Sequence, residues 1–143
     1  MRTTFILAVF ILILSACKKD KFTTAPQISY KSISPSDISY LTTEAPILTF
    51  SITDAEGDLD NTAFIYIKNK LTNRFDSLPF PDIRSSSKTD FKADVEVKLN
   101  VGHNCTPVSN VTDSIYYEVY VKDAAKNKSN IITTPDPLLF RCF

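Results

Sequence analysis

Alternation of apolar and polar residues is the feature that most constrains the fold of this chain. Across residues 90–101 every second side chain is apolar, and those between are polar or charged. Successive side chains of a β-strand point to opposite faces, so such a segment buries one face and exposes the other. Similar alternation recurs at 46–53 and 114–122, and no stretch from Phe22 onward has the apolar spacing of an amphipathic helix. The chain is expected to be all-β.

The expected strands are separated by segments rich in turn-forming residues. Strands are expected at 27–34, 46–53, 62–70, 90–101, 114–122 and 138–142. The turn-rich segments are 54–61, 71–88, 102–113 and 123–130. Pro135 and Pro137 cannot donate to a hydrogen-bond ladder, so the last strand is expected at an edge or to be bent. Six or seven strands at this spacing favour an antiparallel β-sandwich.

The first sixteen residues have the pattern of an export signal. Arg2 supplies a positive charge, residues 5–14 are apolar, and Leu-Ser-Ala-Cys follows, ending at Cys17. This apolar run spans about 15 Å as a helix, about half of a bilayer core, so a permanent membrane span is not expected. Leu14-Ser-Ala-Cys17 resembles the lipobox of bacterial lipoproteins, which implies cleavage before Cys17 and a diacylglycerol on its thiol. The alternative is a plain secretory signal with an incidental cysteine.

The precursor is expected to have three parts: a signal peptide at 1–16, the lipidated Cys17 with a charged tether at 17–25, and one domain at 26–143. Lys18-Lys-Asp-Lys21 resembles the charged starts of Gram-negative lipoproteins that are sent to the outer membrane. We therefore expect a lipid-anchored envelope protein, on the periplasmic or the surface face. Without the leader, acidic residues exceed basic ones by one, and this balance predicts no nucleic-acid partner.

Two cysteines remain besides Cys17, and an exported chain would carry them into an oxidising compartment. Pairing of Cys105 with Cys142 would close a loop of about 40 residues and contribute about 4 kcal/mol in the chain-entropy description. The alternative is two free, buried thiols. The sequence leaves both states open.

Residues 113–119, Asp-Ser-Ile-Tyr-Tyr-Glu-Val, resemble the Asp-x-x-x-Tyr-x-Cys pattern of the sixth strand in immunoglobulin-like domains. Val119 stands in place of the cysteine. The resemblance implies a tyrosine corner at Tyr117, with a buried ring and a hydroxyl that hydrogen-bonds the preceding connection. The chain has no tryptophan, so the antibody-type subclass is excluded. More broadly, the chain resembles small lipoproteins with one immunoglobulin-like or cadherin-like domain.

One short segment concentrates acidic residues. Asp54, Glu56, Asp58 and Asp60 fall within seven residues, around Gly57. Ca²⁺ takes six to eight oxygen ligands, and binding it is one way to neutralise such a turn. The spacing differs from that of an EF-hand loop, because the glycine comes too early and no acid follows at the twelfth position.

A second loop is expected beside this acidic turn. In the strand order of an immunoglobulin-like domain, the connection at 123–130 emerges at the same end of the sandwich. Asp123 and Asn127 would then complete a composite oxygen site for Ca²⁺. The alternative is that Lys122, Lys126 and Lys128 of this loop supply the positive charge, in water and at small net gain.

The sequence contains no glycine-rich phosphate loop, no Gly-x-Ser-x-Gly and no His-Glu-x-x-His. The lone His103 is expected to be solvated, and zinc is not expected. The leading hypothesis is therefore a membrane-anchored, non-enzymatic binding or structural module for a protein or glycan ligand. A version stiffened by Ca²⁺ is the sharper form of this hypothesis.

Two other hypotheses come from different classes. Tyr66, Tyr116 and Tyr120 are expected to point outward, which would suit a glycan-binding accessory lipoprotein of an uptake system. Cross-strand packing is the alternative for these tyrosines. A carboxylate-dependent hydrolase is disfavoured, because the acids cluster in one turn and do not face each other across a cleft.

Overall fold

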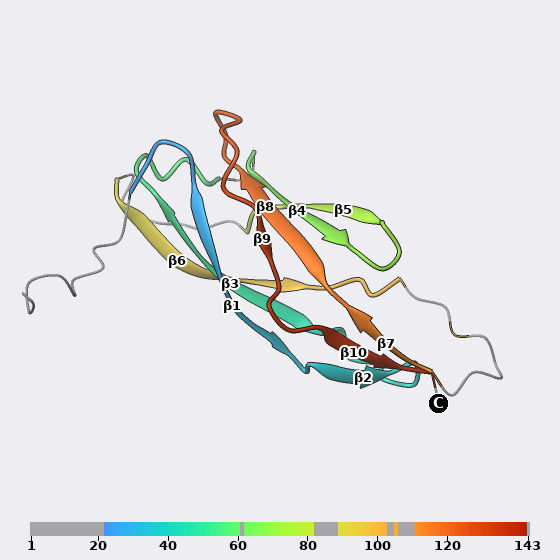
Figure 1. Cartoon of the computed structure of the whole chain (residues 1–143). Coiled ribbons are helices and arrows are strands. Elements are labelled where there is room, and N and C mark those ends of the chain that lie inside the picture. The colour runs from blue at the N-terminus through green and yellow to red at the C-terminus, as the bar shows by residue number, and fades with distance from the viewer. Residues whose placement is uncertain (1–21, 61, 82–88, 103–104, 106–110, 143) are drawn as a thin grey trace, which may run out of the picture.

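The computed structural model describes residues 22–60, 62–81, 89–102, 105 and 111–142 (Figure 1). Residues 1–16, Cys17 and the tether up to residue 21 lie outside this part, as does His103. The described residues form β-strands joined by turns and loops. Among them no helix is long and apolar enough to cross a membrane.

In the described part of the chain, ten strands form three sheets, which are arranged in two layers (Figure 1). They are β1 (Gln27–Ser34), β2 (Asp37–Ser39), β3 (Ile47–Asp54), β4 (Phe64–Asn69), β5 (Phe75–Pro79), β6 (Phe91–Lys98), β7 (Thr112–Ile115), β8 (Tyr117–Lys122), β9 (Ile132–Thr133) and β10 (Leu138–Arg141). One layer has the order β1-β3-β6. The other contains β5-β4-β8-β9 and β2-β10-β7, which are continuous because only Tyr116 separates β7 from β8.

In three cases, two consecutive strands belong to one extended run of chain that is interrupted by a few residues. These pairs are β1 and β2, β7 and β8, and β9 and β10. The described part therefore contains seven runs, and the expected all-β sandwich is confirmed. The first run changes layer: β1 pairs with β3, and β2 pairs with β10 after the cis Ser34–Pro35 peptide. The β2–β10 pair is parallel, which departs from a purely antiparallel sandwich.

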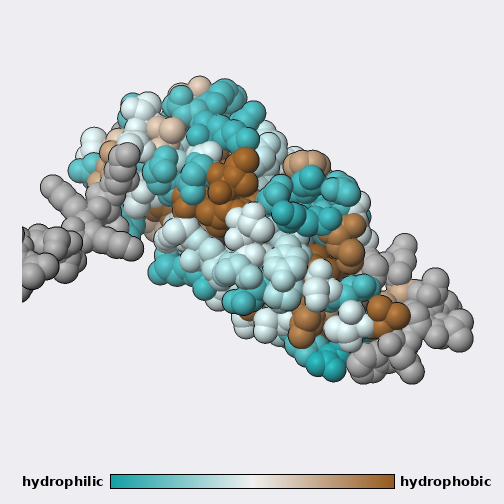
Figure 2. Space-filling view, in the orientation of Figure 1, coloured by the Kyte–Doolittle hydropathy of each residue, from teal (hydrophilic) through white to brown (hydrophobic). Residues whose placement is uncertain are grey.

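The alternating segments supply the core. Leu48, Phe50 and Ile52 of the central strand β3 are fully buried. Val119 and Val121 of β8 are fully buried as well, from the other layer. Side chains at alternate positions of facing sheets fill the space between the layers, which is why the period of two sets the fold. On the outer surface, apolar side chains occur in separate patches among hydrophilic ones (Figure 2).

The structure differs from the expected strands in several places, among them the short strands β2 and β9, which were not expected. Residues 75–79 were expected within a loop, but they form β5 at the edge of a sheet. The segment is polar and ends in Pro79, and an edge strand tolerates both features. The last strand was expected to lie at an edge or to be bent, and the edge alternative is wrong, because β10 lies between β2 and β7. The proline-containing segment 134–137 instead separates β9 from β10.

Strands β3 and β8 end at the same end of the sandwich, where the N-terminal segment also enters. There the Ala55 amide donates to the Thr23 carbonyl at 3.1 Å. On the neighbouring edge, the Asn130 side chain bonds both main-chain groups of Ile28, at 2.8 and 2.9 Å. These bonds join the first strand to the β8–β9 connection and bring the two acidic segments to one end.

Candidate metal centre

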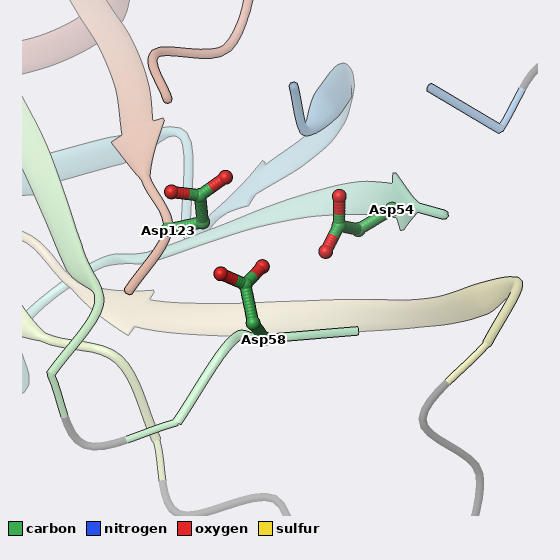
Figure 3. A group of neighbouring side chains, drawn as sticks. All are labelled: Asp54, Asp58 and Asp123. Atoms are coloured by element: carbon green, nitrogen blue, oxygen red, sulfur yellow. The ribbon is translucent and has the colours of Figure 1, made fainter. Parts of the chain in front are cut away.

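Three aspartates from two loops converge at this end of the sandwich. Asp54 is the last residue of β3, Asp58 lies in the turn that follows, and Asp123 comes directly after β8. One carboxylate oxygen from each lies within 4.8 Å of the others. In Figure 3 the three carboxylates face a common space. Asp54 and Asp123 are both 0% exposed, and Asp58 is half-buried. We call these three residues the aspartate cluster.

The acidic turn is held by its own carboxylates. The Gly57 amide donates to Asp54 Oδ2 at 2.8 Å, and Gly57 has a φ of 64°, a conformation that glycine adopts without a steric penalty. The Ala125 amide donates to Asp58 Oδ2 at 3.1 Å. The Ala124 amide donates to the Asp58 carbonyl at 3.0 Å. One oxygen of each carboxylate therefore fixes the position of a loop.

The other oxygens of these two carboxylates have no protein partner. Asp54 Oδ1 and Asp58 Oδ1 are buried and accept no hydrogen bond from any described residue. Most buried polar atoms in proteins are hydrogen-bonded, and a buried charge is normally paired or bound to a metal. A cation among these two oxygens, or a proton shared between the two carboxylates, would satisfy them.

Asp123 is positioned from behind by its own loop. Asn127 donates to both of its carboxylate oxygens, from the main-chain amide to Oδ1 at 2.7 Å and from Nδ2 to Oδ2 at 2.9 Å. Each carboxylate oxygen has two lone pairs, so Asp123 retains acceptor capacity. The sequence predicted Asn127 as a ligand; in the structure its side-chain nitrogen orients Asp123.

Two predicted ligands are not part of the aspartate cluster. Glu56 and Asp60 are exposed. Asp60 Oδ1 accepts from the Thr62 hydroxyl at 2.7 Å and from the Thr62 amide at 2.8 Å. These hydrogen bonds hold the pKa of Asp60 below its usual value. The segment after Asp54 is a turn and not a strand, so these acids, which are two residues apart, do not share a face; only Asp54 and Asp58 turn inward.

The lysines of the second loop do not neutralise the cluster. Lys126 Nζ donates to the Thr62 carbonyl at 3.3 Å. Lys122 Nζ lies 5.5 Å from the ring centroid of Tyr66, and Lys128 Nζ lies 4.1 Å from that of Tyr120. Within the described part of the chain no ion pair joins a lysine to the cluster. Lysine charge therefore reaches the exposed rim of the turn, where Lys126 helps to lower the pKa of Asp60, and not the aspartate cluster.

The electrostatics of the cluster follow from this arrangement. Burial raises the pKa of Asp54 to about 6; the charge of Asp58, a side-chain hydrogen bond with Asp58 and the charge of Asp123 add to the rise, against the lowering effect of the Gly57 amide. At pH 7 Asp54 is therefore largely ionised, at an electrostatic cost. A single cation among the oxygens would offset this cost.

The distances suit Ca²⁺. Its bonds to oxygen are about 2.3–2.6 Å long, so two oxygens on one ion are at most about 5 Å apart. The oxygens of the cluster lie within 4.8 Å of one another. Three carboxylates form a hard, all-oxygen donor set, whereas zinc sites use nitrogen and sulfur in most cases.

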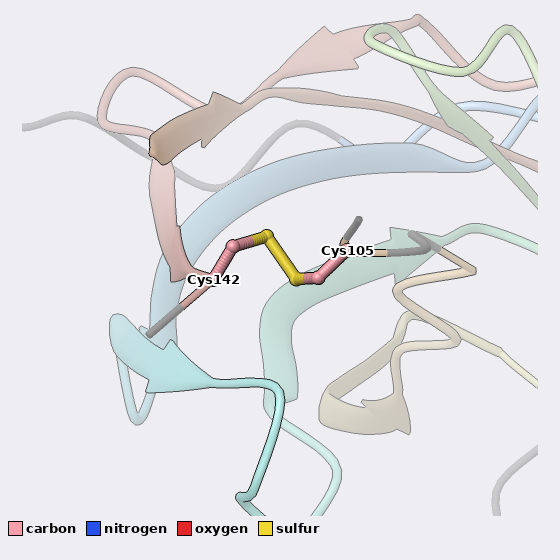
Figure 4. The surroundings of a disulfide bond; sticks show 2 residues. All are labelled: Cys105 and Cys142. Atoms are coloured by element: carbon pink, nitrogen blue, oxygen red, sulfur yellow. A yellow bond between two sulfur atoms is a disulfide. The ribbon is translucent and has the colours of Figure 1, made fainter. Parts of the chain in front are cut away.

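The predicted cysteine pair lies at the opposite end of the sandwich (Figure 4). Cys105 and Cys142 are joined by a disulfide with a Cα–Cα distance of 5.4 Å. The bond ties the segment after β6 to the end of β10. The two ends of the sandwich therefore differ in chemistry: a covalent link at one and a cluster of acids at the other.

The ring of Tyr117 is buried, as the tyrosine corner implies, with 1% of the residue exposed. Its hydroxyl has no hydrogen-bond partner among the described residues, and residues 106–110 of the preceding connection lie outside them. Burial, with a contribution from Asp76, raises the pKa of Tyr117 to about 12. The hydrogen bond of a tyrosine corner is thus not found in the described part.

Comparisons with family models, with curated proteins and with solved structures give no match. The functional interpretation accordingly depends on the residues of this chain.

Proposed function

We propose that this chain is a membrane-anchored, non-enzymatic lipoprotein of the cell envelope, whose β-sandwich is a binding or structural module stabilised by one Ca²⁺. The observation that supports the metal is the pair of buried, unpartnered oxygens, Asp54 Oδ1 and Asp58 Oδ1. The Leu14-Ser-Ala-Cys17 sequence supports the anchor.

Asp54, Asp58 and Asp123 would hold the ion. Bound Ca²⁺ supplies positive charge to three carboxylates that otherwise repel, and it links the β3–β4 connection to the β8–β9 connection. Backbone carbonyls and water commonly complete its six to eight ligands. The ion would change the charge balance of the cluster, and no catalytic role is proposed for it.

The position of the cluster supports a mechanical role. Thr23, near the start of the described chain, is hydrogen-bonded to Ala55, the residue after Asp54. An ion at Asp54 would therefore stiffen the end of the sandwich that is closest in sequence to the anchor. With this end stiffened, the orientation of the β-sandwich relative to the anchor would be more fixed.

Calorimetric titration of the purified full chain with Ca²⁺ tests the metal. One ion per chain is expected, with a dissociation constant of about 10⁻⁴ to 10⁻³ M, as in extracellular calcium modules. Asp58→Asn removes a ligand that is only half-buried and should abolish the heat of binding. The matched control is Asp60→Asn, which removes the same charge from the same turn. Asp60 accepts from Thr62 and is not part of the aspartate cluster, so this variant should bind Ca²⁺ as the wild type does.

Three results would overturn the calcium proposal. They are the absence of binding in the wild type, equal binding by Asp58→Asn, and equal weakening by Asp58→Asn and Asp60→Asn. The last result would indicate diffuse attraction to an acidic turn and not a site.

Metabolic labelling with palmitate tests the anchor separately. The wild type should incorporate label and sediment with membranes, and Cys17→Ser should do neither. An unlabelled wild-type protein that retains residues 1–16 would contradict the anchor and leave the metal site standing.

A further inference from the structure

The outer face of the sheet β5-β4-β8-β9 carries aromatic rings and lysines in register. Phe64, Tyr66 and Lys68 point outward from β4, since Ile65 and Ile67 between them are buried. On β8 the outward residues are Glu118, Tyr120 and Lys122. Phe64 pairs with Lys122, Tyr66 with Tyr120, and Lys68 with Glu118. We call these six residues, together with Lys128, the lysine–tyrosine face.

Two tyrosines form the centre of this face. The rings of Tyr66 and Tyr120 stack with their centroids 4.7 Å apart and an interplanar angle of 8°. Each ring therefore has one side covered by the other, which is the cross-strand packing that the sequence offered as an alternative. Tyr116 is not in this pair; it lies between β7 and β8.

Ammonium groups are held beside the rings. Lys128 Nζ lies over the Tyr120 ring, 4.1 Å from its centroid, and Lys122 Nζ lies 5.5 Å from the centroid of Tyr66. A neutral sugar that stacked on Tyr120 would have to displace Lys128. The arrangement thus offers positioned cations and ring edges, and not bare aromatic platforms.

The charge of the face is strongly one-sided. Lys68, Lys122 and Lys128 form no ion pair with a carboxylate of the described residues, and Lys68 Nζ lies 5.4 Å from the Phe75 ring. Glu118 is paired with Lys70 at 3.1 Å. The whole chain has no net charge, so this local excess of lysine is a property of the face and not of the composition.

The spacing of the lysines favours a ligand with repeated negative charges. Lys68 and Phe64 are four residues apart on β4, and Lys122 pairs with Phe64. The backbone positions of Lys68 and Lys122 are therefore about 13 Å apart along the strand direction. An extended chain that lies across a flat sheet can engage both lysines at once. The tyrosine hydroxyls between them can donate to sugar hydroxyls or carboxylates.

We infer that the lysine–tyrosine face binds an acidic polysaccharide, through its uronic acid carboxylates, at Lys68, Lys122 and Lys128. Charge complementarity selects the anionic class, and the stacked rings hold the ammonium groups in place. Lys122 and Lys128 flank the loop that carries Asp123, so binding to this face is measured with Ca²⁺ removed.

Gel-retardation titrations of the full chain in EDTA test this inference, with hyaluronan as the uronic acid polymer and dextran as the neutral one. Hyaluronan should retard the protein in a salt-dependent manner, and dextran should not. The triple variant Lys68→Gln, Lys122→Gln, Lys128→Gln should lose at least about tenfold in affinity, which is 1.4 kcal/mol or more. The matched control removes three lysines from the other layer, through Lys31→Gln, Lys92→Gln and Lys98→Gln, and should bind within about twofold of the wild type.

Several outcomes would overturn the inference. Equal weakening by both triple variants would indicate nonspecific attraction, and retardation by dextran would indicate neutral-sugar binding. Failure of hyaluronan to retard the wild type would remove the acidic polysaccharide. If phosphatidylglycerol vesicles bind the wild type and hyaluronan does not, the face contacts a membrane surface. Circular dichroism of both variants verifies that each is folded.

Discussion

Replacing Asp54 with asparagine should stabilise the protein in the absence of Ca²⁺, and Ca²⁺ should reduce that advantage. Asparagine removes the charge, but its side-chain oxygen can take the place of Asp54 Oδ2 and accept the hydrogen bond from the Gly57 amide. The pKa of Asp54 is about 6 against the usual 3.8, a difference equivalent to about 3 kcal/mol of unfavourable ionisation. Without Ca²⁺ at pH 7, Asp54→Asn should therefore be more stable than the wild type, by up to about 3 kcal/mol.

With Ca²⁺ the advantage of Asp54→Asn should shrink. At about 10 mM Ca²⁺ and a dissociation constant of about 10⁻⁴ to 10⁻³ M, mass action stabilises the wild type by about 1.4 to 2.7 kcal/mol. The variant lacks one of three carboxylates and should gain little. For a domain of this size, each kcal/mol corresponds to about 4 °C in Tm. The wild-type Tm should rise by roughly 5–10 °C, and that of Asp54→Asn should hardly change.

Thermal unfolding of both proteins, followed by circular dichroism in EGTA and in Ca²⁺, provides the assay. Asp60→Asn is the control, because Asp60 is exposed and bonded to Thr62; it should follow the wild type in both buffers. The reasoning is refuted if Asp54→Asn is less stable than the wild type in EGTA, or if Ca²⁺ raises both Tm values equally.

Three further predictions concern pH, the disulfide and the core. The folded state binds the Asp54 proton more tightly than the unfolded chain does, so the metal-free wild type should gain about 1 kcal/mol relative to Asp54→Asn as pH falls from 7 to 5, measured by urea unfolding; a flat difference would contradict the raised pKa. Cys105→Ser with Cys142→Ser should lower the free energy of unfolding by about 4 kcal/mol, and peptide mapping before and after reduction should show one linked pair. Phe50→Ala should cost about 3–5 kcal/mol in urea, because Phe50 is fully buried, while Ca²⁺ binding to the folded fraction persists; a cost under 1 kcal/mol would contradict the packing.

The sequence predicted those parts of the fold that depend on local alternation. The inward side chains of β3 and β8, such as Phe50 and Val119, are buried as the period of two requires. It did not predict β5, because a polar segment that ends in Pro79 has the composition of a loop until a neighbour such as β4 pairs with it. Pairing of distant strands is a tertiary property that local composition does not contain.

For the candidate metal centre, too, the sequence predicted the local features and not those that depend on tertiary contacts. The run of acids in the β3–β4 connection and the expected neighbourhood of Asp123 were both visible in the sequence. Which acids turn inward was not, since it depends on the Gly57 conformation and on the amides of Ala124 and Ala125. The lysines were a plausible counter-charge until the structure placed Lys128 beside a tyrosine ring.

The most direct test of the calcium site is a crystal structure of the full chain grown with Ca²⁺, with anomalous data collected. The account predicts one anomalous peak about 2.3–2.6 Å from oxygens of Asp54, Asp58 and Asp123. A cluster without such a peak in saturating Ca²⁺, with a lysine ammonium among the three carboxylates, would contradict it.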